Sequence, residues 1–289
     1  MVICTKRSLS PSTICGYRKC WSALKDVHNL TITDLSPAII KNWIKSQATT
    51  LKTIRNQLSF LRSAIDEAVT DGLININSVS LVTASRYQSS ERQKDSEYIV
   101  DPFSPLGVNA ILNNTTYKQW ENIFRFAFYT GMRSSELCAL RWSDVDFIHR
   151  SVSISQASVV GIIKGTKTKA GTRTIALDDE AIRALIEQKE FTFLKGDTVF
   201  NDPKTNKAWA GADAIRKKAW VPTLRKAGIR YRNPYQTRHT FATRHISRGV
   251  NLFWLAGQMG HKGPEMLFRH YGTYLKEYDG NTGVQNNFP

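Results

Sequence analysis

The sequence predicts a mainly helical protein with one small antiparallel β-sheet, divided into two domains. Apolar residues recur at helical spacing through residues 10–80. The stretch 83–98 is rich in serine, glutamine and charge, and it contains almost nothing to bury, as is typical of a linker. Beyond it, helical patterns surround a segment of strict alternation at 151–155. We therefore expect a helical domain over 1–82, a linker over 83–98 and an α+β domain over 99–289.

The first domain is expected to consist of helices that carry several basic side chains. Apolar residues fall at helical spacing over residues 14–24. Ser36 followed by Pro37 is typical of an N-cap and a first helical position, so a helix should begin there. Another apolar face runs over 51–69, and Gly72 should end that helix. The basic residues are Lys41, Lys45, Lys52, Arg55 and Arg62. Taken alone, they indicate only a solvated helical face.

The second domain is expected to mix helices with a few strands. An apolar helix over Trp120–Tyr129 should end at Gly131 and be followed by a short helix at 134–140. The acidic run Asp178–Glu180 favours the start of a helix. The expected strands are 151–155, 159–163 and 173–177, the last two joined by a long turn. The further helices expected are 212–220, 235–247, 251–259 and 264–274, with Gly249 and Gly260 at C-cap positions.

The composition favours a cytoplasmic protein that binds a polyanion. The 289 residues have a formal net charge of +16, and the 27 Lys+Arg against 16 Asp+Glu after residue 98 contribute +11 of it. Nucleic acid is therefore the first partner to expect. The four cysteines form no CxxC pair, and the first ten residues contain no apolar signal segment. No apolar run approaches the roughly 20 residues of a membrane span.

Two arginines are candidates for binding a phosphodiester. Cleavage of DNA needs a nucleophile, positive charge on the non-bridging oxygens and a proton for the leaving oxygen. Arginine suits the second task, because its planar guanidinium binds phosphate through two hydrogen bonds and stays charged. Arg133 follows a glycine break between helices, and Glu136 could orient it from one turn away. Arg238 lies near the start of a helix, where the helix dipole also favours phosphate.

Three further candidates follow the same order along the chain. The turn 164–173 contains four cations, and a lysine there could enter a DNA groove and protonate a leaving oxygen, although most such turns are only solvated tips. His261 follows an expected helix end, and Tyr271 lies on the next helix. Singly, these would be surface and packing residues. The order of arginine, lysine, arginine, histidine and tyrosine suits phosphoryl transfer from DNA to a tyrosine.

These segments together resemble the tyrosine recombinase, or phage integrase, family. TGMRSSELCALRWSDVDF at 130–147 resembles its first arginine box. RHTFATRHISRG at 238–249 and MGHKGPEMLFRHY at 259–271 resemble its second. The resemblance covers about 100–275, and the helical segment 10–80 is more loosely similar to the family's core-binding domain. It implies a C-shaped clamp around double-stranded DNA, with the catalytic residues in the second domain.

The resemblance implies a role for each candidate. Arg133 and Arg238 would hold the scissile phosphate, Lys167 would be the general acid, His261 a supporting donor and Tyr271 the nucleophile. The nucleophile would form a 3′-phosphotyrosine and release a 5′-hydroxyl. Such a link conserves the energy of the phosphodiester bond, so resealing needs neither ATP nor a metal. In agreement, the sequence contains neither HExxH spacing nor a GxxxxGK[ST] loop, and no cofactor is expected.

The sequence departs from the family pattern in three places. Tyr235 stands where a histidine is usual, and its hydroxyl can still bond to a phosphate but accepts a proton less readily near pH 7. Tyr271 lies one residue farther from the preceding Gly-His pair than is common, so Tyr274 stays open as a rival nucleophile. Lys169 competes with Lys167, which we favour because a threonine follows it, as in the family's Lys-Thr pair.

The function implied is site-specific recombination that integrates or excises a phage or other mobile element. Four protomers would act on two DNA duplexes, with accessory directionality or bending factors. The helical domain begins within about ten residues of Met1, so the arm-binding domain that precedes it in most such integrases is expected to be absent or truncated. Two alternatives stay open. One is a type IB topoisomerase, and the other is a DNA-binding protein that descends from a recombinase, with Tyr235 as a sign of decay.

Overall fold

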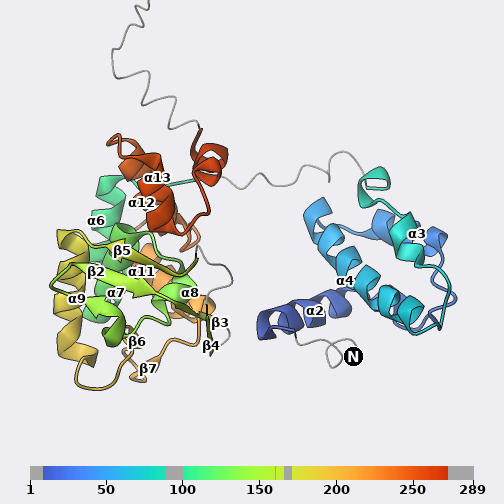
Figure 1. Ribbon diagram of the computed structural model, residues 1–289, viewed down its shortest axis with the longest axis horizontal. Helices are drawn as coiled ribbons and strands as arrows, with labels where there is room; N and C mark the ends of the chain where they lie inside the picture. The colour runs from blue at the N-terminus through green and yellow to red at the C-terminus, as the bar shows by residue number, and fades with distance from the viewer. Residues whose placement is uncertain (1–8, 89–99, 160, 166–170, 273–289) are drawn as a thin grey trace, which may run out of the picture. The chain divides into compact units, whose positions relative to one another are not determined.

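The structure is a computed structural model that describes residues 9–88, 100–159, 161–165 and 171–272. It divides into two compact units, Met1–Ile99 and Val100–Pro289, whose elements are labelled in Figure 1. Within the described ranges, none of the helices has the length and apolar character needed to cross a lipid bilayer. Each unit has its own hydrophobic core, and each is described by itself.

Unit 1 is helical, as the sequence predicts. Its main helices are α2 (Pro11–Ala23), α3 (Pro37–Ser46) and α4 (Leu51–Thr70). Each begins at a hydroxyl N-cap, because the side chains of Ser10, Ser36 and Thr50 accept a hydrogen bond from the backbone N–H three residues later. The helix start predicted at Ser36 is therefore confirmed. α4 ends at Thr70, and Gly72, with a φ of 73°, reverses the chain after the C-cap Asp71, as expected.

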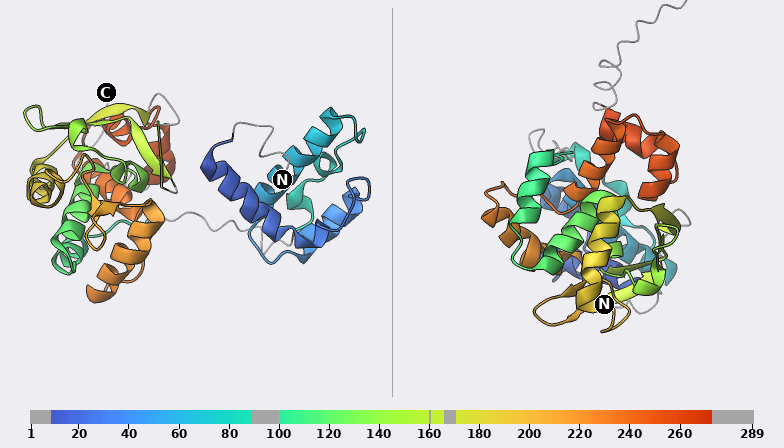
Figure 2. Two further views of the ribbon diagram at one scale, coloured as in Figure 1. Left: turned by 90° about the horizontal axis from the view of Figure 1, so that it is seen from below. Right: turned by 90° about the vertical axis from the view of Figure 1, so that its left-hand side faces the viewer.

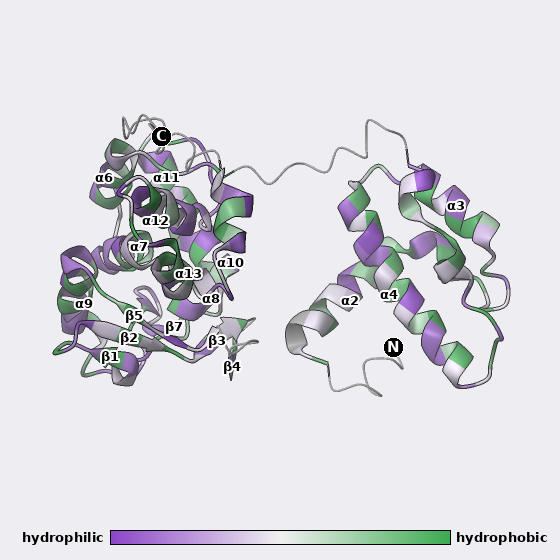
Figure 3. Cartoon of the chain, turned by 45° about the horizontal axis from the view of Figure 1, so that its top comes forward, coloured by the Kyte–Doolittle hydropathy of each residue, from purple (hydrophilic) through white to green (hydrophobic). Residues whose placement is uncertain are grey.

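The long helix α4 organises the core of unit 1. It contacts α2 and the short 3₁₀ turns η2 (Ser78–Leu81) and η3 (Ala84–Arg86). Figure 3 shows apolar and polar residues alternating along its length. The buried apolar residues of α4 are Leu51, Ile54, Leu58, Leu61, Ile65 and Ala68. The basic side chains of this helix therefore occupy the faces left over.

Unit 1 extends farther along the chain than expected. Ala84 is buried, and Tyr87 packs against the same core. Gln88 Nε2 donates a hydrogen bond to the Thr49 carbonyl at 2.6 Å. The linker predicted over 83–98 therefore does not hold for residues 83–88, because their few apolar side chains find partners that the local composition could not reveal. The rest of the predicted linker lies outside the described residues.

Unit 2 consists of helices around a small sheet. The helices before the sheet are α6 (Pro105–Asn113), α7 (Lys118–Thr130), α8 (Ser134–Leu137) and the 3₁₀ turn η4 (Trp142–Asp144). Those after it are α9 (Asp179–Thr192), α10 (Ala212–Ile215), η6 (Arg216–Trp220), α11 (Val221–Lys226), α12 (Gln236–Ile246) and α13 (Leu252–Met259), followed by helical residues 265–272. α6 was not predicted, and α8 ends earlier than expected. The start of α9 is confirmed, with Asp178 as its N-cap.

The strands form short antiparallel ladders. β1 (Val145–Asp146), β2 (Ser151–Ile154) and β5 (Arg173–Ala176) make a three-stranded sheet in the order β1-β2-β5. β3 (Gln156–Val159) pairs only with β4 (Ile162–Gly165), and β6 (Asn201–Asp202) with β7 (Lys207–Ala208). The strand predicted at 159–163 is wrong. Gly161, with a φ of 75°, belongs to the turn of the β3–β4 hairpin and divides that segment.

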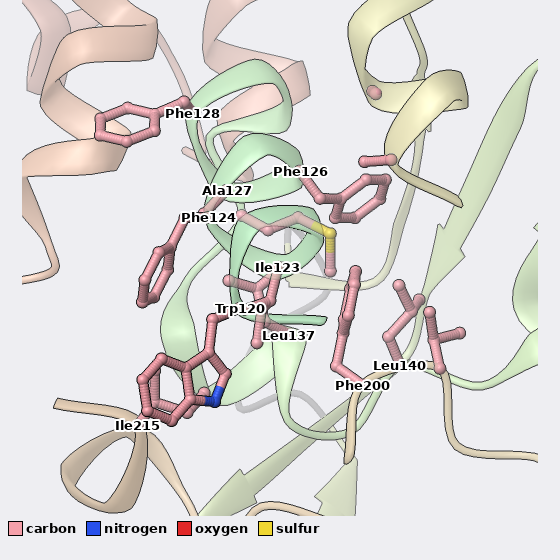
Figure 4. Close-up of a cluster of buried hydrophobic side chains, with 14 of the residues drawn as sticks. Trp120, Ile123, Phe124, Phe126, Ala127, Phe128, Leu137, Leu140, Phe200 and Ile215 are labelled. Atoms are coloured by element: carbon pink, nitrogen blue, oxygen red, sulfur yellow. The ribbon is translucent and has the colours of Figure 1, made fainter. Parts of the chain in front are cut away.

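The core of unit 2 surrounds α7. Its residues 122–128 are all buried, which is the pattern of a helix covered on every side. Figure 4 shows its aromatic side chains radiating to α8, to Phe200 and to Ile215. Trp220 is fully buried and meets the rings of Phe124 and Phe103 edge-on, at 5.1 and 5.8 Å between centroids. This packing fixes the end of α7, where the candidate site begins.

The helix predicted at 212–220 continues to Lys226 through a wide turn. η6 has π-helical hydrogen bonding, and Pro222 follows it in α11. Proline has no N–H to donate and its ring crowds the preceding turn, so one π turn accommodates it without ending the helix. The prediction stopped too early because proline within a helical pattern usually marks its end.

We predict that Gly131→Ala destabilises unit 2 more than Gly228→Ala does. Both glycines have left-handed φ, 63° and 66°, which costs a side chain about 1 kcal/mol. A Cβ at Gly131 would also lie 2.5 Å from the Phe241 ring, whereas at Gly228 it would meet nothing within 4 Å. We expect a loss of about 3 kcal/mol for Gly131→Ala, including overpacking. Urea unfolding measures both variants, and equal losses would contradict the close approach.

Candidate active site

Four separate segments of unit 2 meet at the candidate site. They are the end of α7 at Gly131, the start of β5 at Arg173, the start of α12 after Tyr235 and the end of α13 at Gly260. α13 lies beside β5, and both can be followed in Figure 2. Gly131 and Gly260 both have left-handed φ, 63° and 68°. The chain therefore turns sharply at both helix ends and directs the following residues toward one another.

Arg133 is held at the edge of the site with part of its side chain accessible. It is the N-cap of α8, and its Nη1 donates to Glu136 Oε1 at 2.8 Å. Its Nη2 donates to the Gly260 carbonyl at 3.2 Å, 127 residues along the chain. The side chain is 33% exposed, which leaves room for an incoming anion. The contact with Glu136 has the geometry that the sequence suggested for an orienting partner.

Glu136 is a buried carboxylate shared by two arginines. It is 3% exposed, and Arg173 Nη2 donates to its Oε2 at 2.9 Å while Arg173 Nη1 donates to its Oε1 at 3.1 Å. Burial alone would raise the pKa of Glu136, but the hydrogen bond and charge of Arg173 and the charge of Arg133 outweigh it, and the pKa lies below its usual value. Glu136 is therefore ionised and fixes both guanidinium groups.

Sequence reasoning missed Arg173, which joins three segments. Its Nε donates to the Gln258 carbonyl at 3.0 Å and its Nη1 to the Gly171 carbonyl at 3.1 Å, in addition to its bonds with Glu136. A Cβ on Gly260 would lie 2.7 Å from Arg173 Nη1, so the close contact between the Arg173 guanidinium and this backbone requires glycine. A signal was present in the sequence. Arg173 is two residues before the core residue Ile175 and so falls on the inward face of β5.

Arg238 is a buried cation with no carboxylate bonded to it among the described residues. It is 1% exposed. Its Nη1 donates to the Gly131 carbonyl at 2.8 Å, and its Nη2 donates to the Met259 carbonyl at 2.5 Å. Its Nε has no hydrogen-bond partner in the same part of the structure. Burial lowers the pKa of the Arg238 guanidinium to about 10, and the charges of Arg133 and Arg173 act in the same direction.

His261 lies directly against Arg238. Arg238 Nη2 is 2.8 Å from His261 Nε2, and arginine can only donate, so Nε2 must be the acceptor. The proton of the neutral imidazole is therefore on Nδ1, which is buried and lacks a partner in the described residues. The pKa of His261 is lowered to about 3. Burial is the largest cause, and the charge of Arg238 is the next largest. His261 thus presents one neutral N–H donor without an acceptor.

Tyr271 reaches the site through a histidine that sequence reasoning also missed. Tyr271 is 2% exposed, and its Oη is 2.6 Å from His239 Nδ1. Tyr235 also packs against His239, with ring centroids 5.1 Å apart, and the Arg238 guanidinium carbon is 6.0 Å from the Tyr235 ring. The signal for His239 was its place next to Arg238 in the same helix. The lysines Lys167 and Lys169 and the rival Tyr274 lie outside the described residues.

The arrangement is suited to binding an oxyanion. The guanidinium groups of Arg133 and Arg173 bind the Glu136 carboxylate, whereas Arg238 Nε and His261 Nδ1 have no acceptor among the described residues. The described residues contain no cluster of histidine, cysteine, aspartate and glutamate that could hold a metal ion. A phosphodiester would supply the missing acceptors and the missing negative charge, and the Tyr271 hydroxyl lies against His239, the residue that follows Arg238.

Comparison with known proteins gives a match to one family. Residues 106–277 match the family model described as the Phage integrase family. Prophage integrase IntR of Escherichia coli (strain K12) is 30% identical over 251 residues, which cover 79% of this chain and 59% of that protein. The chain therefore spans about three fifths of the length of this relative.

Solved structures share the fold. A Tn1549 transposon integrase in complex with transposon right end DNA has a TM-score of 0.72 and 20% identity, covering 92% of this chain and 91% of that one. A lambda integrase tetramer bound to a Holliday junction has a TM-score of 0.68 and 17% identity, covering 93% and 74%. The predicted fold class, mainly α with small antiparallel sheets, is thereby confirmed.

We predict that Glu136→Gln lowers the free energy of unfolding by about 3 kcal/mol, because it leaves Arg173 buried without its counter-charge. Arg141→Gln is the control, since it also removes one charge from an ion pair, here with Asp144, but the Arg141 side chain is 37% exposed. We expect the control to lose less than about 1 kcal/mol. Urea unfolding of both variants is the measurement. A Glu136→Gln variant as stable as the control would show that Glu136 does not stabilise the buried arginine.

We predict that stability falls as the pH is lowered from 7 to 5. The folded pKa values of His239 and His261, about 4 and 3, lie below the usual 6.5, so the unfolded chain takes up protons first. The contribution of these two histidines to the free energy of unfolding is complete above pH 6.5. It is lost as the pH falls toward their folded-state pKa values, by about 2 kcal/mol per histidine at pH 5. Thermal unfolding of His261→Asn should show a shallower decline. A wild-type slope in this variant would mean that His261 is not held neutral.

Proposed function

Because the chain belongs to the phage integrase family, we propose that it is a site-specific tyrosine recombinase acting on double-stranded DNA in the bacterial cytoplasm. It would integrate or excise a phage or other mobile element. One observation carries the proposal. The buried Arg238 has no bonded carboxylate among the described residues, and it lies beside His261, whose Nδ1–H also lacks an acceptor there. A buried cation and two unused donors are costly unless an anion completes them.

The scissile phosphate would be held between the two arginines. Arg133 is partly exposed and can turn toward the non-bridging oxygens without losing Glu136. Arg238 offers its free Nε–H from a fixed position. His261 adds a neutral donor, so it stabilises the charge that develops on the oxygens without repelling the arginines. Tyr235, whose ring is 6.0 Å from the Arg238 guanidinium carbon, would donate a further hydrogen bond to the phosphate from its hydroxyl.

The reaction would proceed by direct displacement at phosphorus. Tyr271 Oη would lose its proton to water and form a bond to phosphorus, while the bond from phosphorus to the 5′-oxygen breaks. The leaving oxygen would take a proton from Lys167 and become a 5′-hydroxyl. The products would be a 3′-phosphotyrosine and a free strand end. Attack by the 5′-hydroxyl of a partner strand would reverse each step and complete the exchange.

Exchange between two duplexes requires more than one copy of the chain. We propose four copies on two duplexes, the stoichiometry implied by the family resemblance. The fold is shared with a lambda integrase that was solved as a tetramer bound to a Holliday junction. The formal net charge of +16 suits double-stranded DNA as the partner, because each duplex carries a dense row of phosphates.

We predict that Tyr271→Phe binds DNA normally but forms no covalent adduct. The probe is a set of nicked duplexes that tile both ends of the element encoding this chain, and the adduct is read on a denaturing gel. Removing one hydroxyl leaves the ring packing intact, so duplex affinity should change less than about twofold. Tyr274→Phe is the control and should form the adduct. If Tyr274→Phe is inactive and Tyr271→Phe is active, the nucleophile is Tyr274.

We predict that Lys167→Ala cleaves an ordinary phosphodiester slowly and a 5′-bridging phosphorothiolate at nearly the wild-type rate. A general acid matters in proportion to how poor the leaving group is, and a thiolate leaves without a proton. Lys169→Ala is the matched control and should show weaker binding with a shallower salt dependence, and no rescue by sulfur. Rescue of Lys169→Ala alone would exchange the two roles. Rescue of neither would move the proton donor to another side chain.

A further inference from the structure

His239 lies against the hydroxyl that the proposed function makes the nucleophile. Its Nδ1 is 2.6 Å from Tyr271 Oη, and the two ring centroids are 5.5 Å apart. The residues are 3% and 2% exposed. A hydrogen bond between two buried groups is stronger than the same bond in water, and it is not exchanged readily for a bond to solvent. It therefore fixes the direction of the Tyr271 hydroxyl.

The helix α12 places the His239 ring with little freedom. Tyr235, one turn earlier, meets the imidazole edge-on, with an interplanar angle of 70°. The Tyr271 ring also packs against the imidazole, with ring centroids 5.5 Å apart. The preceding residue is Arg238, whose guanidinium is anchored by the Gly131 and Met259 carbonyls. The phosphate clamp and the partner of the tyrosine hydroxyl are thus consecutive residues of one rigid helix.

The charge of His239 suits an uncharged hydrogen bond. Burial lowers its pKa to about 4, and the charges of Arg238 and His270 act in the same direction. At pH 7 the imidazole is neutral, with one N–H and one acceptor nitrogen. It can bond to the hydroxyl without placing a second cation beside Arg238. A positioning role therefore fits His239 better than a role as a base, which would require a buried imidazolium next to that guanidinium.

We propose that His239 is the positioning residue of the nucleophile, holding the Tyr271 hydroxyl in one direction through its Nδ1. The proposal rests on the proposed function, since it assigns Tyr271 that role. A tyrosine side chain turns about two bonds, and a misplacement of about 1 Å can slow a reaction about 100-fold. In this chain Tyr235 occupies the position where the family usually has histidine, and the imidazole that contacts the Tyr271 hydroxyl is that of His239, one turn later.

Three substitutions separate the hydrogen bond from the volume of the ring. Asparagine places its amide close to where Nδ1 lies, so His239→Asn can still reach Tyr271 Oη. His239→Leu has nearly the same shape as asparagine and no polar atom. His239→Gln is polar but carries its amide one carbon too far, near the former Nε2. A purely structural role for the ring would affect the asparagine and leucine variants alike.

The test measures single-turnover adduct formation with saturating protein on the nicked duplexes described above, together with duplex affinity and thermal unfolding. We expect His239→Leu and His239→Gln to be about 100-fold slower, with duplex affinity changed less than about twofold. His239→Asn should recover to within about tenfold of the wild-type rate. A 5′-bridging phosphorothiolate should not rescue the leucine variant, because its defect lies with the attacking group.

Two results would overturn the assignment. One is a leucine variant that reacts at the wild-type rate or faster. The other is an asparagine variant as slow as the leucine variant, which would assign the ring to packing. If the leucine variant unfolds at a much lower temperature, the rates of His239→Asn and His239→Gln are compared instead, because both variants keep a buried amide. Equal rates for these two variants would then overturn the assignment. The wild-type adduct and its loss in Tyr271→Phe test the proposed function separately, so failure of one claim is distinguishable from failure of the other.

Discussion

The site depends on one buried guanidinium, that of Arg238. No carboxylate is bonded to it in the described residues, and the atoms that hold it are the carbonyls of Gly131 and Met259. Both lie at the C-terminal ends of helices, α7 and α13, where unpaired carbonyls concentrate the negative end of the helix dipole. Two helix ends therefore stabilise a cation whose charge is left uncancelled. The glycine turns, the burial of α7 and the order of the elements all serve to bring these two ends together.

The neighbouring groups keep that charge available. The charge of Glu136 reaches Arg238, yet the Glu136 oxygens accept hydrogen bonds from Arg133 and Arg173, so Glu136 orients the cluster without cancelling the charge of Arg238. His239 and His261 are neutral because burial and the same guanidinium depress their pKa values. The site thus separates its tasks. Positive charge belongs to the arginines, whereas the histidines contribute hydrogen bonds of fixed direction.

The sequence predicted those parts of the site that depend on local signals. Arg133 and Arg238 could be identified because each follows a helix boundary that glycine or proline marks. The helix starts at Ser36 and Asp178 were predictable for the same reason. Arg173 and His239 were not found, because their importance comes from contacts with residues 37 and 32 positions away. The strand predicted at 159–163 was wrong, since Gly161, with a left-handed φ, separates the end of β3 from the start of β4.

Arg238 Nε and His261 Nδ1 have no acceptor in the part of the chain that the structure describes, so we expect the stability of the free protein to depend on dissolved anions. An anion that enters the site binds the native state and not the unfolded chain, so it raises the apparent stability in proportion to the logarithm of its concentration. Linkage then works in both directions. A substitution that introduced a carboxylate beside Arg238 would make the free protein more robust and would reduce its affinity for DNA by a comparable free energy. Thermostability selected without DNA would therefore work against function in this fold.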